Sequence, residues 1–355
     1  MPRHLMRVFV AYAEELKRIA FTPPSLRDPW ITRIKLFYSE RLPQLEESLV
    51  VQRVEPSPIG EEELLRAHDR DYIEFVKRKS TEGKGLLDYG DTPAYPGVFE
   101  DALTTTAATL TLARRLLLEG GVGFNPNGGF HHARRRSAGG FCVFNDLAVT
   151  ALWLRGHGVE RVAIIDIDAH HGDGTQQILY STDVLKISVH GYGYGFYPGT
   201  GWIDELGEGA GYCRNFNIPV PLGSGDDIFI KVLEEVITPL IDAYRPGFLI
   251  IQAGVDGHRG DPLTDLNYTE HSYMHFASFV SRYAAGGTPV LVTGGGGYVP
   301  STVSRVWALV LSRIAGGDAS PFLVGDERTA SSGDIMSLVE DRVAWLKEKI
   351  RECKF

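Results

Sequence analysis

Residues 161–174 read RVAIIDIDAHHGDG, in which an apolar run is followed at once by aspartates and histidines. Continuous apolarity over roughly four to eight residues is typical of a strand that is covered on both faces. Three further runs of this kind are VLKISVH (184–190), GFLIIQAG (247–254) and TPVLVTGG (288–295). Amphipathic stretches that we expect to be helices lie near 145–155, 226–243, 269–285 and 301–314. Alternating strands and helices predict a three-layer α/β/α fold around a central, mostly parallel sheet.

No fixed-period repeat, low-complexity tract or linker rich in proline and serine divides the 355 residues. We therefore expect residues 1–355 to form a single domain. Residues 1–98 are the least regular part, and within them Glu61–Lys79 has the apolar spacing of an amphipathic helix. A second helix is expected over residues 98–119, where two glycines then provide a stop.

The composition limits the partners of this chain. Its net charge of -9 gives no general attraction to nucleic acid or to anionic membranes. Three distant cysteines, Cys142, Cys213 and Cys353, predict neither a disulfide framework nor a structural zinc site, so we expect a reducing, cytoplasmic location. No run approaches the roughly 20 apolar residues of a membrane span. The sequence leaves oligomerisation open.

The first apolar strand ends in side chains that suit a metal ion. Asp166 and Asp168 alternate along the pleat, and His170 continues the alternation. Carboxylate oxygen and imidazole nitrogen are donors for zinc or a similar divalent ion. The alternative is that these groups only cap the strand. A third ligand is expected from another strand end, where Asp256 is favoured over Asp261 and His258 because it lies nearest the apolar run.

A second polar cluster is the histidine pair that follows the short strand expected in VGFNPN. The glycines before His131 and His132 let the backbone approach a site closely. One imidazole would act as a general base and the other as an electrostatic partner, with Asp166 and Asp173 orienting them. The alternative is a pair of exposed loop histidines.

Four glycines, 294–297, follow the last apolar run and end at Tyr298. Glycines let the chain pass close to a group bound at this end of the sheet. The phenol of Tyr298 is then the first functional group available there. A tyrosine hydroxyl can donate a hydrogen bond to a developing oxyanion. The alternative is a tyrosine that only packs.

Six motifs in this order resemble those of the histone deacetylase superfamily, including its prokaryotic and acetoin-utilisation-type members. They are GGFHHA (128–133), GGFCVFND (139–146), DIDAHHGDG (166–174), FYPGTG (196–201), GVDGHRGDP (254–262) and GGGGY (294–298). The resemblance implies an arginase/deacetylase-type α/β fold and zinc-dependent hydrolysis of an amide.

The resemblance also implies roles for individual residues. The metal ligands would be Asp168, His170 and Asp256. The catalytic residues would be His131 and His132, with Asp166 and Asp173 behind them, and Tyr298 polarising the carbonyl. Substrate would be bound by Phe141 and Tyr197 as tunnel walls, Gly140 beside them, and Asp91 at the rim. Asp166 and Ser188 would belong to a potassium site.

Three positions depart from the family pattern. Tyr197 stands where many members have phenylalanine, and Phe130 replaces a tryptophan that is frequent before the histidine pair. Both side chains are expected to affect which acyl chains the tunnel accepts. Leu263 stands where the polyamine-selective branch often has an acid, and its presence favours acyl-lysine as the substrate.

The expected reaction removes acetyl or another acyl group from a lysine side chain, with iron as an alternative to zinc. Deacetylation of an acetylpolyamine or of another small acylated amine is the main alternative. A dinuclear manganese ureohydrolase would need further acids where Gly172 and Gly254 stand. A binder of acyl-lysine without activity is the remaining alternative.

Overall fold

The computed structural model describes residues 5–325 and 327–355. Its centre is one eight-stranded sheet with the order β2-β1-β3-β8-β7-β4-β5-β6, in which every neighbouring pair is parallel. The strands are β1 (Arg7–Ala11), β2 (Val50–Val54), β3 (Val122–Asn125), β4 (Val162–Asp166), β5 (Leu185–Tyr192), β6 (Asn215–Pro221), β7 (Phe248–Gln252) and β8 (Val290–Thr293).

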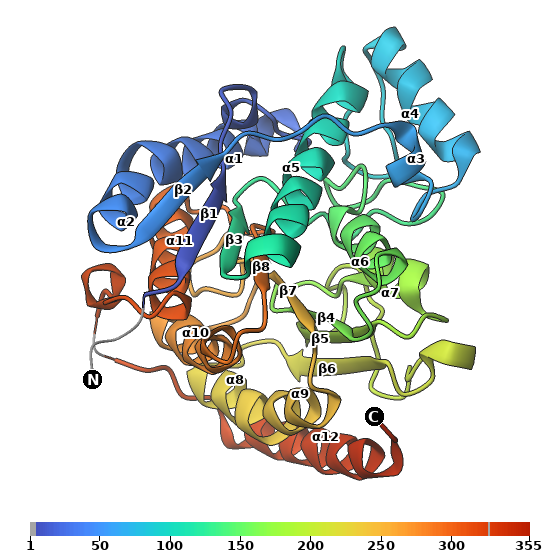
Figure 1. Ribbon diagram of the computed structural model, residues 1–355. Coiled ribbons are helices and arrows are strands. Elements are labelled where there is room, and N and C mark those ends of the chain that lie inside the picture. Colours follow the sequence, from blue (N-terminus) through green and yellow to red (C-terminus); the bar gives the residue numbers. More distant parts are fainter. Residues whose placement is uncertain (1–4, 326) are drawn as a thin grey trace.

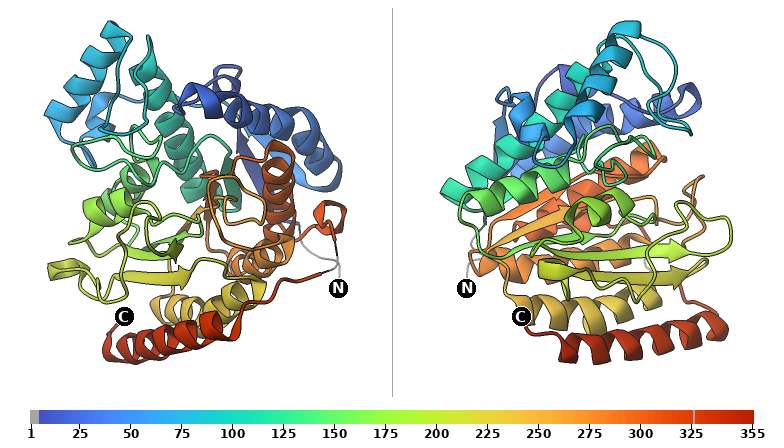
Figure 2. Two further views of the ribbon diagram at one scale, coloured as in Figure 1. Left: turned by 180° about the vertical axis from the view of Figure 1, so that it is seen from behind. Right: turned by 90° about the vertical axis from the view of Figure 1, so that its right-hand side faces the viewer.

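Helices cover both faces of the sheet (Figures 1 and 2). They are α1 (Pro24–Leu36), α2 (Leu42–Ser48), α3 (Glu61–Leu64), α4 (Arg70–Glu82), α5 (Val98–Glu119), α6 (Asp146–Gly156), α7 (Asp173–Leu179), α8 (Asp226–Val232), α9 (Thr238–Tyr244), α10 (Glu270–Ala285), α11 (Pro300–Ile314) and α12 (Gly333–Glu352). Alternate residues of one strand enter different cores: Val8 and Val10 pack on one face, and Phe9 and Ala11 on the other. The predicted three-layer α/β/α fold is confirmed.

The four apolar runs of the sequence are β4, β5, β7 and β8, which form the interior of the sheet with β3 beside them. Every residue of β4 and of β7 is buried, as expected for strands covered on both sides. The helix expected near residues 226–243 is α8 and α9, joined by one π-helical turn at Leu233–Ile237.

The first hundred residues are more regular than their sequence indicated. They contain β1 and β2, which pair with each other in parallel. The single helix expected over Glu61–Lys79 is instead the two helices α3 and α4. The chain turns between them so that the buried His68 can accept a hydrogen bond from the Asn145 amide and donate one to the Arg134 carbonyl.

The expectation of no disulfide is wrong. Cys213, just before β6, is bonded to Cys353, which follows α12, with 5.6 Å between their Cα atoms. The two lie 140 residues apart in sequence, but α12 packs along β6 and brings the end of the chain back to the sheet. Cys142 remains a free, buried thiol. A cytoplasmic location therefore loses the support that it drew from the cysteines.

No helix in the described parts of the chain is both long and apolar enough to cross a lipid bilayer.

Candidate active site

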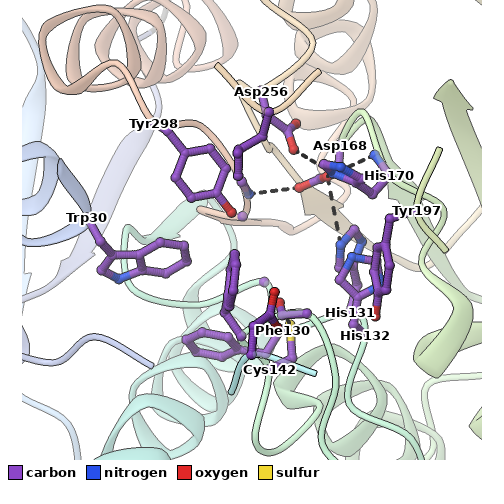
Figure 3. A pocket seen from close by; sticks show the side chains of 17 residues that line it. Trp30, Phe130, His131, His132, Cys142, Asp168, His170, Tyr197, Asp256 and Tyr298 are labelled. Carbon is purple, nitrogen blue, oxygen red and sulfur yellow. Dashed lines mark hydrogen bonds and ion pairs between the residues drawn. The ribbon is translucent and has the colours of Figure 1, made fainter. Parts of the chain in front are cut away.

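Four strands that are adjacent in the sheet deliver the polar clusters of the sequence to one place. In sheet order they are β3, β8, β7 and β4, and the segments after their carboxyl ends carry the histidine pair, Tyr298, Asp256 and the Asp168–His170 segment. The carboxyl ends of parallel strands lie at the same edge, where ligands of such sheets bind. These segments surround a cavity of about 240 Å³ (Figure 3).

One wall of the cavity brings together the three predicted metal ligands. Each of Asp168, His170 and Asp256 offers a donor atom, and these atoms lie within 4.8 Å of one another. His170 Nδ1 is 3.2 Å from Asp168 Oδ1 and 2.8 Å from Asp256 Oδ2. Burial and the nearby Asp168 carboxylate raise the pKa of Asp256 to about 7. Two buried carboxylates this close repel each other, and a divalent cation would relieve that repulsion, so the donor set fits a metal.

Hydrogen bonds from behind hold the carboxylates in place. Gln252 Nε2 and the Gly296 amide both donate to Asp168 Oδ2 at 2.8 Å, and the Ala169 amide donates to Asp256 Oδ1 at 2.8 Å. Such contacts orient ligand oxygens before a metal binds. Sequence reasoning missed Gln252, although a glutamine that ends an otherwise apolar strand was a usable signal.

The two competing candidates for the third ligand have other partners. Asp261 Oδ2 accepts a hydrogen bond from the Tyr298 amide at 2.8 Å, and its Oδ1 accepts one from the Leu263 amide at 3.0 Å. His258 instead faces Glu270, with 3.4 Å between Nε2 and Oε2. Asp261 therefore positions the backbone of Tyr298 and does not join the metal-ligand group.

Both histidines of the pair are buried, and each donates from Nδ1 to its own carboxylate. His131 lies 2.7 Å from Asp166 Oδ2, and His132 lies 2.7 Å from Asp173 Oδ1. An ionised carboxylate can only accept, so Nδ1 of each ring carries a proton, and Nε2 is the ring nitrogen that Asp166 or Asp173 does not engage. The alternative of exposed loop histidines is wrong, because both rings line the cavity.

The two imidazoles differ in protonation. Burial lowers the pKa of His131, but the carboxylates of Asp166 and Asp168 outweigh burial and raise that pKa to about 9. Burial and the charge of His131 lower the pKa of His132 to about 4. At neutral pH His132 is thus a neutral imidazole with its Nε2 lone pair available.

A buried carboxylate that sequence reasoning missed holds the histidine loop. Asp146, at the start of α6, accepts hydrogen bonds from the amides of Gly129 and Phe130 and from Thr109 Oγ1. Next to it, Asn145 Nδ2 donates to the Ala133 carbonyl at 3.1 Å. Both residues belong to the GGFCVFND motif (139–146), and their hydrogen bonds to the histidine loop are not evident from the sequence.

Tyr298 closes the opposite side of the cavity (Figure 3). The described residues give its hydroxyl no hydrogen-bond partner, so the hydroxyl is available to a ligand. Burial and the Asp256 carboxylate raise its pKa well above 10, which keeps the phenol protonated. The close turn before it needs Gly296, because a Cβ there would collide with the carboxylates of Asp256 and Asp168.

Behind this loop lies a buried arginine that the sequence did not single out. Arg33 Nη1 donates to the Gly297 carbonyl at 2.7 Å, and its guanidinium stacks 3.5 Å from the centre of the Trp30 ring. Burial lowers its pKa to about 10, so Arg33 remains charged at neutral pH. Trp30 itself lines the cavity beside Tyr298 and was also missed.

The residues expected to bind substrate all line the cavity. They are Asp91, Gly140, Phe141, Tyr197 and Leu263. Phe141 has a left-handed backbone (φ 65°), is held by a hydrogen bond from its amide to Thr92 Oγ1, and places its ring 6.3 Å from that of Tyr298. The Tyr197 ring lies 4.9 Å from that of His132, and a Cβ at Gly140 would overlap the His132 ring.

The neighbouring Phe196, to which we assigned no role, stacks on His170 with the rings 5.0 Å apart and nearly parallel. The residue that precedes the histidine pair, Phe130, is buried between Phe21 and Trp30. The indole next to Phe130 is that of Trp30, which comes from α1 and not from the position directly before the histidine pair.

Asp166 and Ser188, the residues of the expected potassium site, are direct neighbours in the register of β4 and β5. Ser188 Oγ lies 2.9 Å from His190 Nδ1, and the Asp168 amide donates to Asp166 Oδ1 at 3.1 Å. The potassium site remains a prediction.

Positions that would carry a second set of metal ligands are tightly enclosed. A Cβ at Gly254 would collide with the Asp168 carboxylate, and one at Gly172 would collide with the Asp166 carboxylate. Side chains at these positions would displace the groups that already form the site, so the geometry does not favour a dinuclear ureohydrolase.

The sheet, its covering helices and the site at its carboxyl edge define an arginase/deacetylase-like α/β protein. A family model described as "Histone deacetylase domain" matches residues 31–314. The chain belongs to the histone deacetylase family and is a deacetylase-type hydrolase.

Individual relatives agree with this assignment. A probable deacetylase of Archaeoglobus fulgidus is 36% identical over 317 residues, which cover 87% of this chain and 83% of the relative. The acetoin utilization protein AcuC of Staphylococcus aureus is 36% identical over 275 residues, covering 73% of this chain and 70% of the relative. The crystal structure of the HDA15 HD domain superimposes with a TM-score of 0.83 and 26% identity, covering 99% of both chains.

Proposed function

We propose that this protein is a zinc-dependent deacylase that removes acetyl or related acyl groups from the side-chain amine of lysine. The observation that carries the proposal is the convergence of Asp168, His170 and Asp256 in a cavity whose other walls hold the histidine pair and Tyr298. A metal-ligand group, a neutral base and a phenol donor around one space are the parts that amide hydrolysis requires.

Asp168, His170 and Asp256 would hold the metal ion. When bound, a zinc ion supplies Lewis acidity: it polarises a carbonyl and brings the pKa of a coordinated water down to about 7. Two carboxylates and one imidazole leave room for solvent and substrate in a catalytic site of this kind. The same donors also suit Fe²⁺, so iron is the alternative metal.

The protein's own groups would then share the proton transfers. His132, neutral and held by Asp173, accepts a proton from the attacking water at Nε2. His131, kept protonated by Asp166, stabilises the developing negative charge. The Tyr298 hydroxyl donates a hydrogen bond to the oxyanion. His132 finally returns its proton to the leaving amine, which yields a carboxylate and a free amine.

The walls of the cavity support an acylated lysine as the substrate. Phe141 and Tyr197 present aromatic surface that suits the apolar stem of a lysine side chain. Asp91, exposed at the mouth, is placed to accept hydrogen bonds from the substrate backbone. We further propose that Asp166 and Ser188 take part in a potassium site beside the metal.

A panel of acyl-lysine peptides and acetylpolyamines, assayed before and after chelation and metal restoration, tests this function. We expect acetyl-lysine peptides to be hydrolysed, activity to disappear on chelation, and zinc or ferrous iron to restore it. A preference for acetylpolyamines would replace the proposed substrate with the alternative one. Activity that survives complete metal removal, or no hydrolysis of any substrate by the metal-loaded protein, would overturn the proposal.

A further inference from the structure

One lysine is buried inside the central sheet. Lys186 lies on β5, which pairs with β4 on one side and with β6 on the other, and only 5% of the residue is exposed. Its neighbours Leu185 and Ile187 point into the core on one face of the sheet, so the Lys186 side chain lies on the opposite face. Burying an amine costs free energy unless it gains hydrogen-bond partners. Neither the metal-ligand group nor the proposed proton transfers use this lysine.

Backbone carbonyls hold the Lys186 amine. Nζ donates to the Leu179 carbonyl at 2.7 Å and to the Val184 carbonyl at 3.2 Å. Among the described residues it forms no ion pair with a carboxylate. Burial and the charge of Arg214 lower its pKa to about 7. An ammonium has three N–H groups and a neutral amine has two, so both forms can donate to the two carbonyls.

The first of these carbonyls belongs to the last residue of helix α7. The last carbonyls of a helix have no partner within the helix and carry its partial negative charge, so a donor placed there stabilises the helix end. Thr182 also donates to the Leu179 carbonyl, from its amide and from its hydroxyl. Lys186 is the donor that comes from the sheet, and it therefore ties this end of α7 to β5.

The other end of α7 carries the carboxylate that holds His132. Asp173 is the first residue of the helix and accepts a hydrogen bond from His132 Nδ1 at 2.7 Å. In the same turn, the Thr175 amide donates to the His131 carbonyl at 2.9 Å. A helix of 7 residues is only about 10 Å long, so a displacement at one end is carried to the other.

We propose that Lys186 is a positioning residue, which fixes the sheet end of α7 and thereby sets the place of Asp173 and the orientation of the His132 ring. This inference rests on the proposed function. The other imidazole provides a contrast within the same site, because Asp166, which holds the His131 ring, is itself a residue of β4. Loss of the lysine amine should therefore disturb the His132 ring more than the His131 ring.

The variant Lys186→Met keeps much of the side-chain volume and removes the donor. With the metal-loaded enzyme and an acetyl-lysine peptide, we expect kcat to fall about tenfold, because a small displacement of a catalytic group is costly, and KM to change by less than about twofold. The bound metal should stay at the wild-type level. Lys231→Met is the matched control, because Lys231 lies on α8 and pairs with Glu235, and it should keep the wild-type kcat.

A second variant covers the case in which Lys186→Met does not fold. Lys186→Gln keeps an N–H donor on a shorter stem, so its kcat should lie between those of the wild type and the methionine variant. Wild-type turnover in both variants would overturn the positioning role.

Proton NMR locates the effect without turnover. The Nδ1 protons of His131 and His132 are each hydrogen-bonded to a carboxylate, which moves their signals downfield, and the variants His131→Gln and His132→Gln assign them. In the Lys186 variants the His132 signal should shift or broaden more than the His131 signal.

The outcomes separate the lysine from the catalytic centre. Equal changes in both histidine signals, or a fall in kcat with an unchanged His132 signal, would overturn the role of Lys186. A fall in kcat that accompanies loss of the bound metal would overturn it as well. A wild type that hydrolyses no acyl-lysine substrate would instead count against the proposed function, and the two NMR signals would still decide the role of Lys186.

Discussion

At the residue scale, the two buried imidazoles of the pair take different protonation states: Asp166 and Asp168 keep His131 charged, and burial together with that charge keeps His132 neutral. Asp166 faces His131 without a competing cation, whereas Asp173 is shared between His132 and Arg134. His132 and Arg134 outweigh burial and lower the pKa of Asp173 to about 2. Burial and the charge of His131 keep His132 neutral although Asp173 is ionised, so His132 is the imidazole that can accept a proton at neutral pH.

Replacing Tyr298 with phenylalanine removes one hydroxyl from the cavity and leaves the ring in place. If that hydroxyl donates to the oxyanion, Tyr298→Phe should lower kcat by roughly 10²-fold or more, because this is the usual effect of losing one such donor. KM for an acetyl-lysine peptide should change much less. Turnover equal to that of the wild type would remove Tyr298 from the reaction.

At the scale of elements, buried polar contacts join loops that are distant in sequence. His68 lies in the turn between α3 and α4, and its imidazole connects the Asn145 amide at the start of α6 to the Arg134 carbonyl in the segment after the histidine pair. Since Nε2 accepts and Nδ1 donates, the ring is neutral. Burial accordingly lowers its pKa to about 4. We therefore expect acid to destabilise the contacts that His68 makes.

The effect of pH on His68 has a definite sign. The folded pKa of about 4 is below the unfolded value of about 6.5, so its contribution to stability is complete above pH 6.5 and is lost as the pH falls toward 4. Between pH 7.5 and pH 5 this amounts to about 2 kcal/mol. The variant His68→Gln has a donor and an acceptor for the two hydrogen bonds but does not titrate. Between pH 7.5 and pH 5 its free energy of unfolding should therefore fall by about 2 kcal/mol less than that of the wild type.

Urea unfolding of both proteins at the two pH values measures this difference. The variant His68→Leu is the control for the hydrogen bonds themselves: it should be destabilised at pH 7.5 by about 2 kcal/mol or more, since two buried backbone groups lose their partner. Equal acid sensitivity of the wild type and His68→Gln would show that another group is responsible.

Sequence reasoning found the interior of the sheet because buried parallel strands leave an unbroken apolar run. It missed β2, an edge strand whose Val50 is exposed, and β6, in which the buried Asn215 and Asn217 interrupt the apolar pattern. The acids and histidines of the site were predictable because polar groups directly after an apolar strand are unusual. Arg33 was not, because its role depends on a hydrogen bond to Gly297, 264 residues away.

At the scale of the whole molecule, the end of the chain is tied back to the sheet. Helix α12 lies outside residues 31–314 of the family match, packs along β6 and α8, and is followed by the bond between Cys353 and Cys213. Figure 1 shows α12 below α8 and α9. No described residue of α12 lines the catalytic cavity. We propose that residues 1–355 act as one catalytic domain with this helix as a structural addition.

Removing the disulfide should therefore affect stability and not catalysis. A cross-link over 140 residues restricts the unfolded chain, so the double variant Cys213→Ser, Cys353→Ser should lose about 2 to 4 kcal/mol of unfolding free energy. A reducing agent should destabilise the wild type to the same extent and leave the variant unchanged, with kcat unaltered in both. A wild type that does not respond to reductant would show that the bond contributes nothing to stability.

The proposed hydrolysis depends on one metal ion held by Asp168, His170 and Asp256. Metal content per chain, measured by elemental analysis after loading with zinc and removal of free ions, shows whether these residues hold it, with Asp256→Asn and Asp261→Asn as matched variants. We expect one ion per chain in the wild type and in Asp261→Asn, and a loss of that ion in Asp256→Asn. No bound metal in the wild type, two ions per chain, or full retention by Asp256→Asn would contradict a single metal ion held by these three residues.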